Sequence, residues 1–182
     1  MHDVAQTAQI EKTDAMIQNS LNENYKLAIA ALDDIPGIGR ISAEQIIAET
    51  SADMSHFRNQ HSLSKWAGVC PGNNESAGKR KSGRTPLGNK MLKSTLVQCA
   101  QSAKKNKNSF FSAQYSRLVS HRGKNRANMA VAHSVLIAVF FVLCGHKYKD
   151  LGAEYYNQFN REKKINTSSN SPSSALIFPM IS

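Results

Sequence analysis

The sequence predicts a small all-α domain that carries a helix-hairpin-helix and a long basic loop rich in glycine and serine. Three observations lead to this fold class. Apolar residues at about 7–32 recur at steps of seven and four, the spacing of an amphipathic, coiled-coil-like helix. An apolar segment at about 125–144 has the length of a buried central helix. Nowhere do polar and apolar residues alternate convincingly, as they do in half-buried strands.

Helix breakers place the next elements. Residues 36–39, Pro-Gly-Ile-Gly, separate the first helix from a second one at about 41–50. A short helix at about 63–67 carries the only tryptophan, Trp66, and is expected to end at Gly68.

The second half of the chain contains one long loop and three further helices. Residues 68–88 are too polar and glycine-rich to form a packed element. A helix at about 89–103 follows, and Ser109 could cap the next one, which is expected to end at Gly123. The apolar helix at about 125–144 comes last.

These elements predict three parts. Residues 1–31 form a helical arm, and residues 32–160 form the main domain. Residues 161–182 combine a serine- and asparagine-rich tract with a short apolar end, a composition typical of a disordered tail. Within the main domain lie the helix-hairpin-helix (32–50), the basic loop (68–88) and the later helices (89–144).

Charge is segregated along the chain, whose net charge is +10. Residues 1–75 hold five Lys or Arg and ten Asp or Glu, a net of −5. Residues 76–149 hold fifteen Lys or Arg and no acidic residue, whereas residues 150–182 hold three of each. A solvated surface usually mixes both signs. The basic segment therefore indicates a polyanionic partner, for which nucleic-acid phosphate is the leading candidate over an anionic membrane.

The helix-hairpin-helix is a candidate phosphate site. Gly37 and Gly39 would let the backbone approach a phosphate closely, and the amides of the helix that begins near Arg40 would face the anion. Such a hairpin holds DNA by its backbone and does not read sequence. The alternative is a plain turn in which proline and glycine only end one helix and start another.

The basic loop is a second candidate. Small residues between its cations would let main-chain donors and side-chain charges reach the same phosphates. The cations are Lys79, Arg80, Lys81 and Arg84, followed by Lys90 in the next helix. The alternative, a disordered basic tail or localisation signal, is weaker because apolar segments flank the loop on both sides.

Other classes of protein are disfavoured. Cys70, Cys99 and Cys144 form no CxxC pair, so we expect neither a disulfide framework nor a zinc site, and a reducing cytoplasm fits. The polar, acidic N-terminus does not resemble a signal peptide. The apolar run at 127–144 is slightly short for a membrane span and contains polar residues.

Four segments in order carry a family resemblance. They are IPGIGRISAEQIIAE (35–49), WAGVCPGNNESAGKRKSGRTPLGNKMLKSTLVQCA (66–100), SAQYSRLVSHRGKNRANMAVAH (112–133) and YKDLGAEYY (148–156). Together they closely resemble the C-terminal transposase domain of the IS110 (IS116/IS110/IS902) insertion-sequence family, from about residue 32 to 156.

The resemblance implies a DNA transposase or recombinase of the bacterial cytoplasm that works with a structured bridge RNA and forms homo-oligomers. Family members hold a divalent metal, Mg²⁺, in an acidic site of an N-terminal RuvC-like domain. Their C-terminal domain supplies a serine nucleophile, which corresponds here to Ser76, five residues after Pro71. From composition and spacing alone, Ser76 is only a turn serine.

Two departures from the family qualify this expectation. Only 31 residues precede Leu32, too few for a RuvC-like fold, and the tail after Lys164 does not resemble the family's ending. We therefore expect a truncated copy that binds nucleic acid but is inactive alone. Two alternatives stay open. One is a non-catalytic helix-hairpin-helix protein that acts on DNA architecture or regulates a full-length transposase, and the other is a ribosomal-type RNA-binding protein.

Overall fold

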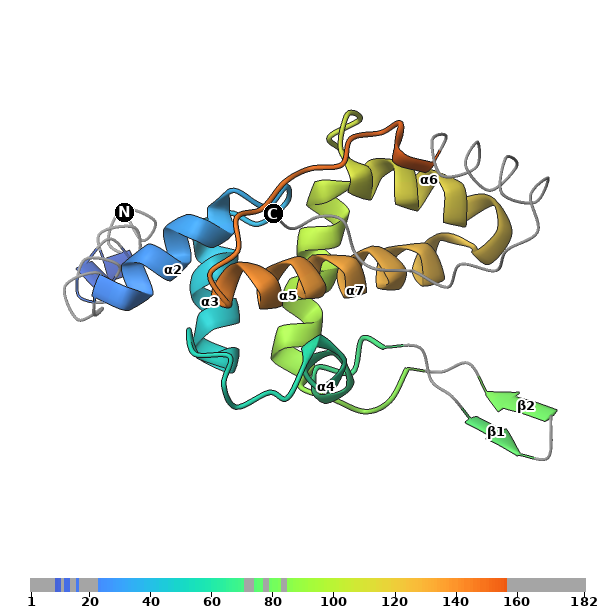
Figure 1. The fold of residues 1–182 in the computed structure, drawn as a ribbon, viewed down its shortest axis with the longest axis horizontal. Helices are drawn as coiled ribbons and strands as arrows, with labels where there is room; N and C mark the ends of the chain where they lie inside the picture. The colour runs from blue at the N-terminus through green and yellow to red at the C-terminus, as the bar shows by residue number, and fades with distance from the viewer. Residues whose placement is uncertain are drawn as a thin grey trace, which may run out of the picture.

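The protein is a bundle of helices from which one short hairpin projects (Figure 1). The computed structural model describes residues 9–10, 12–13, 16, 23–70, 74–76, 79–82 and 85–156. Its helices are α2 (Glu23–Asp33), α3 (Arg40–Thr50), α4 (Gln60–Trp66), α5 (Lys90–Ala103), α6 (Phe110–Arg122) and α7 (Lys124–Leu143). The predicted all-α class is confirmed, and the bounds of α3 to α7 lie within a few residues of those expected.

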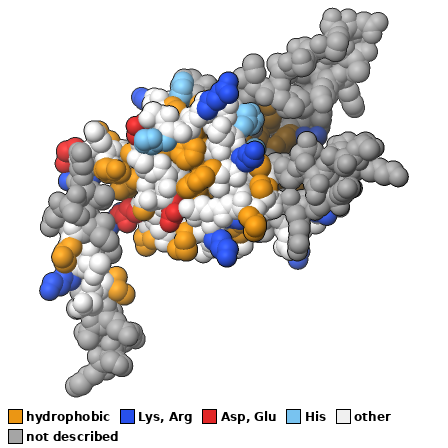
Figure 2. Space-filling model, turned by 90° about the horizontal axis from the view of Figure 1, so that it is seen from below, with side chains coloured by type: hydrophobic (Ala, Val, Ile, Leu, Met, Phe, Trp, Pro, Cys, Tyr) orange, Lys and Arg blue, Asp and Glu red, His pale blue; other side chains and the backbone are white. Residues whose placement is uncertain are grey.

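Helix α4 and the hairpin lie on the same side of the bundle (Figure 1). Figure 2 looks at the molecule from that side. It shows hydrophobic side chains among Lys, Arg and His side chains, with only a few acidic ones. This face is therefore both basic and partly apolar.

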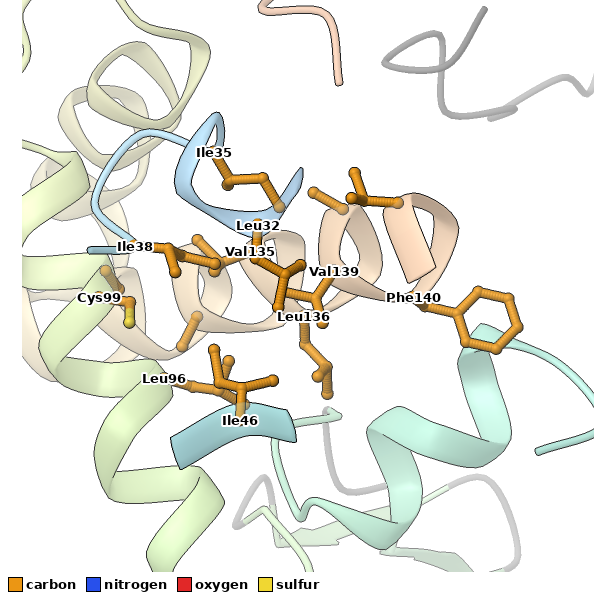
Figure 3. Packing of buried hydrophobic residues seen from close by; sticks show 14 of the residues in the cluster. Leu32, Ile35, Ile38, Ile46, Leu96, Cys99, Val135, Leu136, Val139 and Phe140 are labelled. Atoms are coloured by element: carbon orange, nitrogen blue, oxygen red, sulfur yellow. The ribbon is translucent and has the colours of Figure 1, made fainter. Parts of the chain in front are cut away.

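Helix α7 is the centre of the core. It packs against α2, α4, α5 and α6, and Val131, Val135 and Leu136 are fully buried. Figure 3 shows side chains of α7 meeting those of the α2–α3 segment and of α5, among them Leu32 and Leu96. By length and composition α7 could cross a membrane, but most of it is covered by the rest of the protein. The prediction of a buried central helix is confirmed.

The helices begin in two different ways. The side chains of Asn59, Asn89 and Ser109 cap α4, α5 and α6 by accepting hydrogen bonds from backbone N–H groups of the first turn. The cap predicted at Ser109 is therefore confirmed. Helices α3 and α7 begin after Gly39 and Gly123, which offer no side-chain cap.

Helix α2 crosses the boundary predicted between residues 31 and 32. Leu32 is fully buried, and Tyr25, Ala28 and Ile29 pack against the same core. The part of the arm from Glu23 onward thus belongs to the main domain, because its apolar face is covered by α3 and α7. The predicted tail at 161–182 lies outside the described residues.

The segment after α7 folds back onto α6. A side-chain oxygen of Asp150 accepts hydrogen bonds from the N–H groups of Phe110 at 2.9 Å and of Gly152 at 2.8 Å. The ring of Phe110 contacts the rings of Tyr155 and Tyr156, with centroids 5.3 and 5.4 Å apart. The last of the four sequence blocks thus closes the N-terminal end of α6.

The basic loop contains regular structure that the sequence analysis did not predict. Strands β1 (Asn74–Ser76) and β2 (Lys79–Ser82) form an antiparallel hairpin with an irregularity after Asn74. The strands are short and project from the bundle (Figure 1). They therefore need no apolar face, and the alternation that reveals buried strands is missing.

Candidate nucleic-acid interface

The turn between α2 and α3 is fixed to the core by its isoleucines. Ile35 and Ile38 are buried, and their N–H groups donate to the carbonyl oxygens of Leu32 and Ile35 at 3.1 and 3.0 Å. Gly39 then starts α3 in an extended conformation. The predicted hairpin between two helices is present, and the core sets its orientation.

Gly37 lies close to the backbone of α5. Its φ is +91°, and a Cβ there would lie 2.5 Å from the backbone N of Ala103 and from the carbonyl oxygen of Cys99. The space beside Gly37 is therefore filled by the last turns of α5. This packing alone explains the glycine at position 37, whereas its predicted phosphate contact stays a prediction.

Cys99 takes part in the same packing. Its side chain is buried, and burial raises the pKa of its thiol. A buried neutral thiol is not a nucleophile, so we assign Cys99 a packing role in the hydrophobic core.

Gly39 faces open space. A Cβ at this position would meet no atom within 4 Å, and α3 begins there without a side-chain cap. Because the first amides of a helix have no acceptor within the helix, this end of α3 can accept an anion.

Arg40, the first residue of α3, is ion-paired. Its Nε lies 2.8 Å from Oε1 of Glu44, one turn along the helix. Half of the Arg40 side chain is exposed, with a relative accessibility of 49 %. The carboxylate of Glu44 partly neutralises the cation that the sequence analysis assigned to DNA.

Two glycines hold the base of the hairpin. A Cβ on Gly88 would lie 2.4 Å from the backbone N of Gly68, and Gly68 has a φ of +71°. The N–H of Asn89 donates to the carbonyl oxygen of Trp66 at 3.2 Å, while its side chain caps α5 and donates to Glu49. The two ends of the basic loop therefore lie against each other between α4 and α5.

The register of the hairpin places Ser76 at the end of β1, opposite Lys79. Arg80 is opposite Glu75, and Lys81 lies in β2. Arg84 lies outside the described residues, and Lys90 is exposed at the start of α5. The structure thus brings Ser76 and Lys79 together across the hairpin.

The two predicted sites lie at opposite ends of α5. Gly37 packs on the last turn of this helix, and the base of the hairpin precedes its first turn. A helix of 14 residues is about 21 Å long. The helix-hairpin-helix and the basic hairpin are therefore separate contact regions.

A comparison with known families identifies the domain that contains both regions. The model of the transposase IS116/IS110/IS902 family matches residues 29–116, from α2 into α6. This match makes residues 29–116 similar to a transposase domain of this family. The resemblance seen in the sequence is confirmed as far as residue 116, and it supports a transposase-related function. A search of curated proteins found no match to the chain.

The transposase domain has basic residues near the helix-hairpin-helix that the sequence analysis did not single out. Because Gly37 packs on Ala103, the turn after α5 lies beside it. Lys105 and Lys107 are exposed in this turn, whereas Lys104 lies 4.5 Å from the centre of the Tyr115 ring. The lysines at 104–107 could have been recognised as a basic group from the sequence. No sequence pattern, however, connects them with Gly39, which lies more than 60 residues earlier.

A third basic group lies at the corner between α6 and α7, beyond the region that the family model matches. Arg122, Lys124 and Arg126 are exposed around Gly123, whose φ is +77°. The cations of the acid-free segment are thus distributed over the hairpin, the turn after α5 and this corner.

No group of three or more His, Cys, Asp or Glu side chains that could hold a metal occurs among the residues that the structure describes. The family resemblance assigns the divalent metal to a separate RuvC-like domain, and that assignment stays a prediction.

Proposed function

We propose that this transposase domain binds DNA by its phosphate backbone and supplies Ser76 as the nucleophile of a DNA transesterification. The observation that carries the proposal is the position of Ser76. It ends β1 on a basic hairpin, opposite Lys79, and the base of that hairpin is held between α4 and α5. A serine on a projecting hairpin can reach the backbone of a DNA that is bound to the helical bundle.

Phosphate binding in this proposal uses groups spread over the surface. Gly39 supplies the amide end of α3, the turn after α5 supplies Lys105 and Lys107, and the hairpin supplies Lys79 and Lys81. These donors can contact phosphates and carry no information about base sequence. The domain should therefore bind duplexes of different sequence with similar affinity.

Lys79 is the preferred cation for the reaction. Residues directly opposite in an antiparallel pair have Cα atoms only about 4.5–5.5 Å apart, and Lys79 has this relation to Ser76. Arg80 has the same relation to Glu75, and residues of opposite charge directly across a strand pair attract each other. We therefore assign charge stabilisation at the attacked phosphorus to Lys79 before Arg80.

A serine hydroxyl attacks only when a base removes its proton. We propose that the base comes from a RuvC-like domain and that a structured bridge RNA guides the DNA. Both components follow from the family resemblance. The alternative function is a nucleic-acid-binding regulator in which Ser76 takes no part in chemistry.

Salt dependence tests the binding part of the proposal. If six of the fifteen cations at 76–149 contact phosphates, log K against log salt should have a slope of about −5 for duplex DNA. Replacing Lys79, Arg80, Lys81 and Arg84 with alanine should weaken binding to all sequences alike and make the slope less steep. Fluorescence anisotropy at several salt concentrations measures both effects. A flat response of the unmodified protein would contradict the proposal.

The ion pair at the start of α3 gives a separate prediction. Glu44→Gln should remove this ion pair and make the charge of Arg40 more available to a phosphate, which should raise duplex affinity about threefold and steepen the salt slope by about 0.9, the value for one added contact. Glu23→Gln is the matched control, since it removes the partner of Lys26 on α2 and changes net charge equally. Equal effects of the two variants on the slope would show that Arg40 makes no phosphate contact.

A further inference from the structure

Three exposed apolar side chains gather at the base of the hairpin. Trp66 at the end of α4 is 41 % exposed, Leu87 is 97 % exposed and Met91 in the first turn of α5 is 65 % exposed. The hydrogen bond from Asn89 to Trp66 and the contact between Gly68 and Gly88 bring them together. We call these three residues the Trp66 patch.

The indole of Trp66 is held in place from one side. Its ring centroid lies 5.5 Å from that of Phe57, with an angle of 57° between the ring planes. Packing on Phe57 restricts the indole, so a ligand that stacks on it loses little side-chain entropy. Nucleobases are ligands of this kind, because every base has a flat face.

Cations border the patch. Lys65 and Lys90 are exposed and directly precede Trp66 and Met91 in sequence, and the basic hairpin starts from the same place. The nearby carboxylate of Glu49 is engaged by the side chain of Asn89. Exposed aromatic rings accompanied by lysines bind single-stranded nucleic acid, with bases stacked and phosphates neutralised.

A second copy of the chain fits the patch less well. Three apolar residues are far fewer than the roughly 20–30 residues that each partner contributes to a stable protein interface. In a two-fold dimer formed through the patch, Lys65 and Lys90 of both copies would also be brought together. Charge and size thus both favour a nucleic acid.

We infer that the Trp66 patch binds an unpaired nucleobase of the nucleic acid that the basic hairpin contacts. Trp66 stacks on the base, Leu87 and Met91 cover its edge, and Lys65 and Lys90 bind the flanking phosphates. The inference rests on the proposed function and adds a preference for single-stranded or locally opened substrate. Unpaired bases can stack on the patch, whereas paired bases are enclosed in the duplex.

Tryptophan fluorescence tests this inference directly, because Trp66 is the only tryptophan of the chain. A single-stranded oligonucleotide should quench the emission by about half or more in a saturable titration, and a duplex of the same sequence should quench it little. Trp66→Leu should weaken single-strand binding about 5- to 150-fold, the range for loss of one stacked base. Trp66→Phe should restore most of the affinity. Anisotropy of a labelled oligonucleotide measures binding by these variants.

A second pair of variants does not depend on the packing of Trp66. Leu87→Glu changes a side chain that is 97 % exposed, so the fold should be unaffected. It should lower the ratio of single-strand to duplex affinity at least fivefold. Leu27→Glu, at an exposed position of α2, adds the same charge and should leave the ratio unchanged.

The outcomes separate the two ideas. If duplex binding stays salt-dependent but single strands neither quench Trp66 nor respond to Leu87→Glu, this inference is wrong and the proposed function stands. If the protein binds neither form of DNA, the proposed function fails as well. An emission shift that depends on protein concentration alone, together with a dimer that Leu87→Glu abolishes, would make the patch a self-association surface and overturn the inference.

Discussion

Replacing Gly37 with alanine should lower the free energy of unfolding by about 2–5 kcal/mol, the sum of a left-handed backbone penalty and the cost of overpacking. The backbone at Gly37 has a φ of +91°, and a Cβ would meet the backbone of α5 at 2.5 Å. Neither α5 nor the turn can move away without opening the core around Ile35 and Ile38. Urea denaturation followed by circular dichroism measures the change.

Gly39→Ala is the matched control. A Cβ at Gly39 meets nothing within 4 Å, and the backbone conformation there is an ordinary one. The free energy of unfolding should therefore change by less than about 1 kcal/mol. Gly39→Val should then lower duplex affinity in a folded protein, because a bulky side chain keeps a phosphate from the amides of α3. Equal destabilisation by Gly37→Ala and Gly39→Ala would contradict the packing role of Gly37.

Ser76→Ala should abolish covalent attachment of the protein to DNA. In the proposed step, Ser76 Oγ bonds to phosphorus as one P–O bond to deoxyribose breaks. The base takes the hydroxyl proton and passes it on to the leaving deoxyribose oxygen. In the absence of a RuvC-like domain, the chain should form no adduct. With cognate DNA ends, bridge RNA and a RuvC-like domain in trans, a band that survives denaturant should appear on a gel. Salt-dependent DNA binding should stay nearly unchanged, since one neutral hydroxyl contributes little to phosphate affinity.

Ser82→Ala distinguishes chemistry from general effects on the hairpin. Ser82 lies in β2 opposite Asn74, toward the base of the same hairpin. This variant should retain the adduct. Loss of the adduct in Ser82→Ala but not in Ser76→Ala would show that Ser82, and not Ser76, is the nucleophile. No adduct from the unmodified protein in the complete mixture would favour the non-catalytic regulator.

Local patterns in the sequence determined the helical fold. Ser109 caps α6 as expected because an N-cap needs only a side-chain oxygen next to the first free amides. The apolar stretch of α7 predicted a buried helix because it is apolar on all sides. The acid-free segment likewise indicated a phosphate partner from charge alone, and the four ordered blocks identified the family.

Only the tertiary structure decided how these parts meet. It showed that Gly37 faces α5, that Lys105 and Lys107 lie beside the helix-hairpin-helix, and that Trp66, Leu87 and Met91 share one surface. It also revealed a hairpin in which Ser76 is opposite Lys79. Helix periodicity and capping depend on residues within one or two turns, so a single segment reveals them. Contacts such as that between Gly37 and Ala103 join residues far apart in the chain, and they exist only once the whole core has packed.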